Sequence, residues 1–274
     1  ALLFGAIVLL LSACGGGGGG GGGTGGGTGQ FNLQGLAYKG PVAPGAIKVY
    51  LLNQDGTRGA APIASTTTDA TGRYQLQVPV LVDTPVAIVL TGGSYVDEAT
   101  GGVVPLNPQD QLEAYTDLPA NGILTAQVTP LTTLAAALSR NHQAAGQSLA
   151  ASITNATNEI SYLFDVGNIL TVIPPAISQF AISTPQQRDY ALYLAGLSQL
   201  AQNNAIRIFD IISGMANNLE SNGVLNNTDP TLSPANLAHA AEQFIQSHNN
   251  LLITYLSPQS VAALSTNNVV DPKT

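Results

Sequence analysis

The sequence predicts an α+β protein in which a β-rich segment over residues 31–128 precedes an α-helical segment over residues 129–274. Before residue 129, apolar and polar residues alternate in short runs, which is the pattern of half-buried strands. After it, apolar residues recur every three or four positions, which is the spacing of amphipathic helices. We therefore expect an N-terminal antiparallel β-sandwich followed by a C-terminal α-helical bundle.

The strands are expected where short apolar runs lie between glycine- and proline-rich breaks. Alternating runs predict half-buried strands at residues 31–34, 47–51 and 74–78. Residues 86–90 are apolar throughout, which predicts a central strand covered on both faces. Residues 111–115 and 124–128 are further strand candidates.

One turn is especially informative because its residues have defined conformational roles. A threonine-rich strand over residues 65–68 leads into Asp69, whose carboxylate can accept hydrogen bonds from its own downstream backbone. Gly72 can adopt a positive φ, after which a second strand begins. The pattern predicts a hairpin between the two strands.

Hydroxyl–proline pairs mark the expected helix starts, because the hydroxyl caps the helix and proline fits its first position. The pairs are Thr129-Pro130, Thr184-Pro185 and Ser233-Pro234, with Ser257-Pro258 before a short additional helix. Five narrow apolar stripes lie within residues 131–138, 149–163, 190–201, 208–219 and 237–255. They predict a bundle, and residues 165–183, which contain Pro174-Pro175, predict an irregular crossover.

The composition excludes some classes of function. Only 9% of the residues are charged, against about 25% in an average domain, so polar uncharged side chains must solvate much of the surface. Eight basic residues against sixteen acidic ones argue against nucleic acid as a partner, since phosphate binding needs clustered positive charge. A single cysteine excludes a disulfide framework and a cysteine-based zinc site.

The first fourteen residues are typical of an export signal. Residues 1–11 are uninterruptedly apolar, but a membrane-spanning helix needs about 20 residues. The run fits the apolar core of a signal peptide, whose basic start is missing from the sequence. The following Leu11-Ser12-Ala13-Cys14 resembles the lipobox of bacterial lipoproteins. The resemblance implies cleavage before Cys14 and attachment of lipid to its thiol, so that the membrane is a partner through this anchor.

Residues 15–30 are almost all glycine and predict a flexible tether. Its first fifteen residues, 15–29, span about 20 Å on average. In lipoproteins of this kind an Asp after the lipidated cysteine retains the protein in the inner membrane. This chain has Gly15 at that position. The resemblance therefore implies that the protein is located at the outer membrane of a bacterial cell envelope.

A second resemblance concerns the β-rich segment. The run Thr67-Thr68-Asp69-Ala70-Thr71-Gly72-Arg73-Tyr74-Gln75-Leu76 is similar to a segment of carboxypeptidase-regulatory-like, or transthyretin-like, β-sandwich domains. Residues 92–101 and 128–134 are similar to segments of bacterial lipoproteins in which that domain precedes a helical region. The resemblance implies a non-catalytic module. The sequence shows no zinc ligands of the kind that a carboxypeptidase needs.

Asp97 and Glu98 are the strongest metal-site candidates, because adjacent carboxylates between glycine-rich turns can hold Ca²⁺. The competing interpretation, which we favour, is a solvated loop without metal. Residues 222–229 resemble a calcium loop only loosely, since they carry Asn where Asp ligands are required, and they predict a turn.

No catalytic constellation is visible: Gly-x-Ser-x-Gly is absent, and the single cysteine is assigned to lipid. His248 is expected to be half-buried with one partner, His239 and Glu242 to form an exposed pair, and His142 to lie near a helix C-terminus. We therefore expect no cofactor and a non-enzymatic module that binds an envelope protein or glycan. Two alternatives stay open: a hydrolase or enzyme accessory with a spatially assembled site, and a Ca²⁺-stabilised adhesin.

Overall fold

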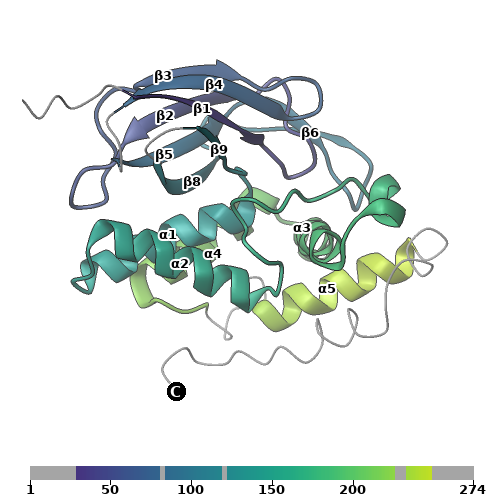
Figure 1. Cartoon of the computed structure of the whole chain (residues 1–274). Helices are drawn as coiled ribbons and strands as arrows, with labels where there is room; N and C mark the ends of the chain where they lie inside the picture. The colour runs from purple at the N-terminus through teal and green to yellow at the C-terminus, as the bar shows by residue number, and fades with distance from the viewer. Residues whose placement is uncertain (1–28, 81–83, 119–121, 226–232, 249–274) are drawn as a thin grey trace, which may run out of the picture.

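A computed structural model describes residues 29–80, 84–118, 122–225 and 233–248 of the chain. Its strands all precede its α-helices (Figure 1). This order confirms the predicted α+β class and the predicted change from strands to helices near residue 129. The predicted signal, Cys14 and most of the tether lie outside the described residues, as does the predicted start at Ser257-Pro258.

The first sheet has three strands in the order β4–β1–β9. β1 (Gly29–Leu36) pairs antiparallel with β4 (Arg73–Val80) and parallel with β9 (Ile123–Thr125). The prediction of purely antiparallel strands is therefore wrong at β9. A parallel pair requires a long connection between its two strands, and here the chain between β1 and β9 includes the whole of the second sheet. The tether prediction is wrong at its last two residues, since Gly29 and Gln30 pair with β4 through backbone groups that need no side chain.

The second sheet is antiparallel and has the order β3–β2–β5–β8. Its strands are β2 (Ala46–Leu51), β3 (Ala64–Thr67), β5 (Thr84–Thr91) and β8 (Gln111–Leu118). The predicted central strand is confirmed in β5, where five consecutive residues are buried. Ile88 and Leu90 join the main core, whereas Ala87 and Val89 contact a cluster that includes Ala136 of the first helix.

The turn after β3 has the predicted chemistry but makes no hairpin. The Asp69 carboxylate accepts hydrogen bonds from the Thr71 and Arg73 amides at 2.8 and 3.0 Å, and Gly72 has a φ of +77°. β3 and β4 nevertheless belong to different sheets, because β3 pairs with β2 and β4 pairs with β1. The turn therefore carries the chain from one sheet to the other.

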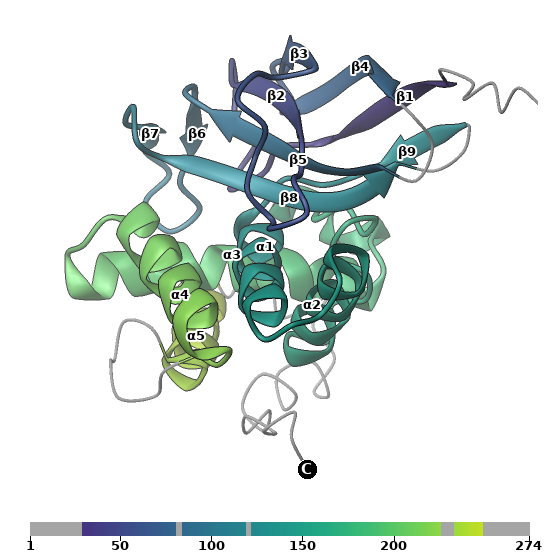
Figure 2. The same ribbon diagram turned by 90° about the vertical axis from the view of Figure 1, so that its left-hand side faces the viewer.

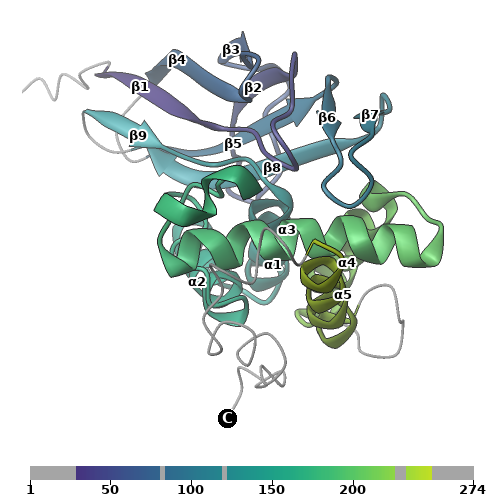
Figure 3. The same cartoon turned by 90° about the vertical axis from the view of Figure 1, so that its right-hand side faces the viewer.

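A short hairpin, β6 (Ser94–Val96) and β7 (Val103–Pro105), extends from the strands toward the helices (Figure 3). Sequence periodicity did not predict these strands, which have three residues each. The Tyr95 ring packs edge-on against Phe209, with the ring centroids 6.4 Å apart. This contact anchors the hairpin on the helical part of the molecule.

The helices lie on one side of the strands (Figures 1 and 2). They are α1 (Pro130–Ala144), α2 (Leu149–Leu163), α3 (Pro185–Asn204), α4 (Ile208–Asn222) and α5 (Pro234–Ser247). The starts predicted at Pro130, Pro185 and Pro234 are confirmed, and Thr129 and Thr184 each form a capping box. The crossover at residues 165–183 contains a single 3₁₀ helix, η1 (Ile177–Ile182).

Two helices are buried far more completely than a narrow apolar stripe predicts. Every residue from Pro130 to Ser139 of α1 is buried, because α1 contacts β8, α2 and α4. α3 is buried almost continuously from Tyr190 to Ala201. Small side chains permit this packing: a Cβ added at Gly196 would lie only 3.0 Å from Ala241 Cβ.

One hydrophobic core connects the two segments, since the largest cluster of buried residues runs from β1 to α5. None of the helices in the described residues has the length and apolar character needed to cross a bilayer. The strands and helices therefore pack against each other as one body, which fixes the surfaces described below.

Candidate functional site

The outer face of the three-stranded sheet carries a cross-strand array of amide side chains. Along β1 and β4, buried apolar residues alternate with polar ones, so the polar side chains share the opposite face. The register places Asn32 opposite Gln77 and Gln34 opposite Gln75. We call these four residues the amide face.

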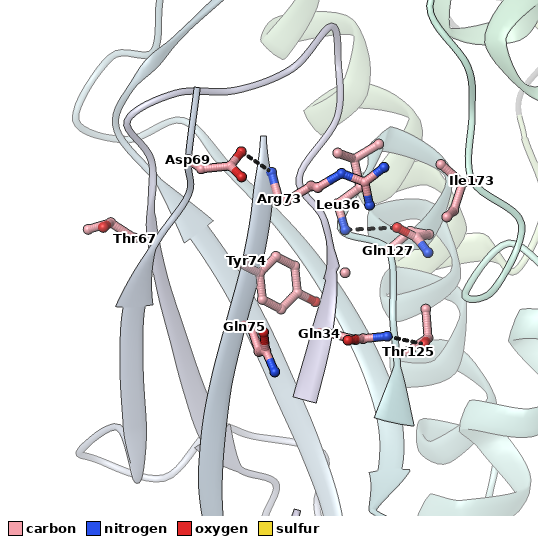
Figure 4. Close-up of a pocket in the computed structure, with 11 residues that line it drawn as sticks. Gln34, Leu36, Thr67, Asp69, Arg73, Tyr74, Gln75, Thr125, Gln127 and Ile173 are labelled. Carbon is pink, nitrogen blue, oxygen red and sulfur yellow. Dashed lines mark hydrogen bonds between the residues drawn. The ribbon is translucent and has the colours of Figure 1, made fainter. Parts of the chain in front are cut away.

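A groove of about 400 Å³ opens at one end of the amide face (Figure 4). This volume falls within the range of about 300–1,000 Å³ that is usual for small-molecule sites. Polar side chains of both sheets and of the segment after β9 form most of its lining. The lining residues are Gln34, Gly35, Leu36, Thr67, Asp69, Arg73, Tyr74, Gln75, Thr125, Gln127 and Ile173.

Gln127 is the most unusual residue of the groove. Its side chain is fully buried, and its Oε1 accepts a hydrogen bond of 2.8 Å from the Leu36 amide. The backbone amide of Gln127 donates to the Leu170 carbonyl, also at 2.8 Å. Its Nε2 has no hydrogen-bond partner among the described residues, although buried amide groups are nearly always paired. The groove thus presents a buried donor whose orientation is already fixed.

The floor of the groove depends on a close backbone approach at Gly35. A Cβ at this position would lie 1.8 Å from the Ala126 carbonyl oxygen. The Tyr74 hydroxyl donates to the same oxygen at 2.6 Å, and burial raises the pKa of Tyr74 above its ordinary value. These contacts hold the segment after β9 against β1, and so position Gln127.

The rim of the groove carries one negatively charged side chain, Asp69, and one positively charged side chain, Arg73. The Asp69 carboxylate accepts bonds from the Thr71 hydroxyl and from two backbone amides, and these bonds lower the pKa of Asp69. The Arg73 guanidinium makes no hydrogen bond within the described part of the chain, and its side chain extends toward Gln127 (Figure 4). Its donors are therefore available to a ligand.

Asp97 and Glu98 lie in a different place, in the turn between β6 and β7, where they contact Ser198 of α3. The solvated-loop interpretation is wrong, because Asp97 is only 7% exposed and the Glu98 side chain only 11%. Lys39, which is fully buried, donates to Glu98 Oε2 at 2.5 Å and to Ser198 Oγ at 2.8 Å. Ser198 in turn donates to Asp97 Oδ2 at 2.5 Å. We call these four residues the lysine cluster.

The lysine cluster borders a cleft of about 280 Å³, lined in part by Asp97, Ser198 and Arg207. A serine beside a lysine can act as a nucleophile when the lysine is neutral and the hydroxyl is reachable. Here Lys39 is paired with Glu98, and Ser198 is 2% exposed. The arrangement is better suited to holding the hairpin on α3 than to catalysis.

The histidines have the expected environments. His248 is half-buried, stacks on Phe244 at 4.2 Å between ring centroids, and lies 3.0 Å from the Phe244 carbonyl. In the His239–Glu242 pair His239 is exposed but Glu242 is half-buried, with 3.7 Å between Nδ1 and Oε2. His142, in the last turn of α1, lies 3.4 Å from Glu159. The described residues contain no group of three His, Cys, Asp or Glu arranged to hold a metal ion.

The loop predicted as a turn begins after α4, where Gly223 ends the helix with a φ of +71°. Residues 226–229, which carry most of its polar side chains, lie outside the described residues. No protein-family model, curated protein or solved structure matches this chain.

Sequence reasoning missed Gln127, Lys39 and Ser198. A signal for the amide face was present, since polar amides recur at alternate positions in both β1 and β4. For Lys39 and Ser198, which are 159 residues apart, no local pattern indicates their contact.

Proposed function

We propose that this chain is a lipid-anchored protein of the bacterial cell envelope whose groove binds a polar ligand without catalysing a reaction. Its two main sheets would form a transthyretin-like sandwich, followed by a helical bundle. A lipid on Cys14 and a glycine tether would display this body at the outer membrane. The observation that carries the binding function is the unpartnered, fully buried Nε2 of Gln127 in a groove lined by further amides.

The anchor is tested by expressing the full chain behind a complete signal peptide in a bacterial host. We expect the wild type in the membrane fraction, with a diacylglyceryl mass on Cys14. Cys14→Ala should abolish the lipid, whereas Ser12→Ala, which keeps a small residue in the lipobox, should not. An unmodified Cys14 in the wild type would contradict the anchor.

The binding function is tested with the lipidated full chain in detergent micelles on an array of envelope proteins and glycans. We expect saturable binding that weakens when Gln34 and Gln75 are both replaced by Ala. Replacing Gln54 and Gln109, two exposed glutamines outside the groove, provides the matched control. Absence of any saturable ligand, or equal binding by both double variants, would refute a binding role for the groove.

A second candidate function, hydrolysis, is favoured by the Ser198–Lys39 contact beside the smaller cleft. A fluorophosphonate probe should then label the wild type but not Ser198→Ala. Our account predicts no labelling of either protein, because Lys39 is paired with Glu98 and Ser198 is only 2% exposed.

The hypothesis that the chain is a Ca²⁺-stabilised adhesin predicts a different result. Millimolar Ca²⁺ would raise the melting temperature, and Asp97→Ala would remove the effect. Asp97 Oδ1 already accepts bonds from the Thr100 amide and hydroxyl, at 3.0 and 2.9 Å, and Lys39 pairs with Glu98. We therefore expect no shift with Ca²⁺.

A further inference from the structure

The groove offers more hydrogen-bond donors than acceptors at one end. Gln127 contributes the unpartnered Nε2, and Arg73 contributes a guanidinium with five N–H donors in a planar fork. Asp69, the nearest rim carboxylate, already accepts three bonds from its own turn. A ligand group that fits this end must therefore bring acceptor oxygens of its own.

A carboxylate satisfies that requirement better than a neutral oxygen does. Its two oxygens match the Arg73 fork, and hydrogen bonds to charged groups are about twice as strong as neutral ones. Gln127 can donate to the same group, because both residues lie at the end of the groove where Leu36 is found (Figure 4). A single guanidinium in a chain of net charge −8 suits a single carboxylate and not a polyphosphate.

The other end of the groove, at Gln34 and Gln75, favours a different kind of ligand group. Gln34 and Gln75 each carry a donor and an acceptor, which is the combination that a hydroxyl group also carries. Gln34 Nε2 and Thr125 Oγ1 are 3.5 Å apart, so their weak hydrogen bond can be replaced by bonds to a ligand hydroxyl. Leu36 and Ile173, at the end of the groove near Arg73 and Gln127, add apolar surface against which the C–H groups of a ring can pack (Figure 4).

We propose that the groove binds an acidic sugar, with its carboxylate at Arg73 and Gln127 and its hydroxyls at Gln34, Gln75 and Thr125. A uronic acid combines these features in one ring: a carboxylate, several hydroxyls and an apolar face. The inference rests on the proposed binding function and adds the class of ligand to it. It also assigns Arg73 as the residue that distinguishes acidic from neutral sugars.

The test is calorimetric titration of the full lipidated chain in detergent with a four-residue oligogalacturonate. The matched ligand is its methyl ester, which keeps the rings and hydroxyls but removes the charges. We expect the acid to bind at least about tenfold more tightly than the ester, as loss of charge-assisted bonds implies. Arg73→Gln should remove this preference by weakening the acid about tenfold or more.

Lys48→Gln provides the control, because it makes the same change of charge at an exposed position on β2, outside the groove. It should leave both affinities unchanged. Equal binding of acid and ester, or equal effects of the Lys48 and Arg73 substitutions, would overturn the acidic-sugar inference while leaving the binding function intact. Binding of neither ligand would also overturn the inference, and the array then decides separately whether the groove binds another ligand.

Discussion

Replacing Lys39 by methionine tests the role of the lysine cluster in joining the β6–β7 hairpin to α3. Lys39 is fully buried and bonded to both Glu98 and Ser198. Methionine fills similar volume but leaves Asp97 and Glu98 buried without a cation. Removing one partner of a buried pair typically costs about 3–5 kcal/mol.

The loss comes from the two carboxylates themselves. In the variant, Asp97 and Glu98 remain buried side by side with no opposing charge, so their repulsion is no longer compensated. We therefore expect Lys39→Met to lower the free energy of unfolding by about 3–4 kcal/mol at pH 7.

The assay is urea denaturation of the variant and the wild type at pH 7, followed by far-ultraviolet circular dichroism. The double variant Lys39→Met/Glu98→Gln removes one of the stranded charges and should recover about 2 kcal/mol or more of the loss at pH 7. A destabilisation below about 1 kcal/mol at pH 7, or a double variant that is no more stable than Lys39→Met, would refute the reasoning.

Three further predictions concern other parts of the molecule. Burial and the charge of Asp165 raise the pKa of Asp189 from 3.8 to about 6, so its ionisation destabilises the fold as pH rises from about 4 to 7. Asp189→Asn should therefore stabilise the protein by about 1 kcal/mol at pH 7.5, after allowance for solvent screening of this half-buried group. At pH 4.5 the gain should be much smaller. A gain in thermal melts that is the same at both pH values would contradict this cause. Thr129 caps α1 and shares a buried hydrogen bond of 2.6 Å with the Tyr190 hydroxyl. Thr129→Ala should cost about 1 kcal/mol more than Thr184→Ala, which removes an exposed cap, and equal costs in urea denaturation would count against a role for the tyrosine bond. Gly35→Ala should cost about 1–3 kcal/mol by forcing the backbone at Ala126 to move. The control is Gly59→Ala, where a Cβ meets nothing closer than 3.5 Å and stability should change by less than about 0.5 kcal/mol. Equal melting temperatures for the two variants would show that the strand can shift without cost.

Features that depend on neighbouring residues could be predicted from the sequence. The Asp69 turn needs only a short polar side chain and a glycine three positions later, and both were visible. The starts of α1, α3 and α5 follow from local hydroxyl–proline pairs. The buried strand β5 follows from an unbroken apolar run.

Features that depend on the partners of an element could not be predicted in this way. The same Asp69 turn fits a hairpin or a crossing between sheets, and only the pairing of β3 and β4 with other strands decides between them. The burial of Asp97 and Glu98 depends on Lys39, which approaches them from the segment after β1. The groove likewise needs β1, β4 and Gln127 to meet, although these segments are distant in sequence.

The side-chain amide resonance of Gln127 gives the most direct measurement of ligand binding in the groove. In isotope-labelled protein titrated with the oligogalacturonate, its Nε2 protons should shift progressively and saturate at the affinity found by calorimetry. The amide of Gln202, which lines the smaller cleft, should remain unchanged. A ligand that saturates the protein while the Gln127 amide signal stays in place would show that binding occurs elsewhere.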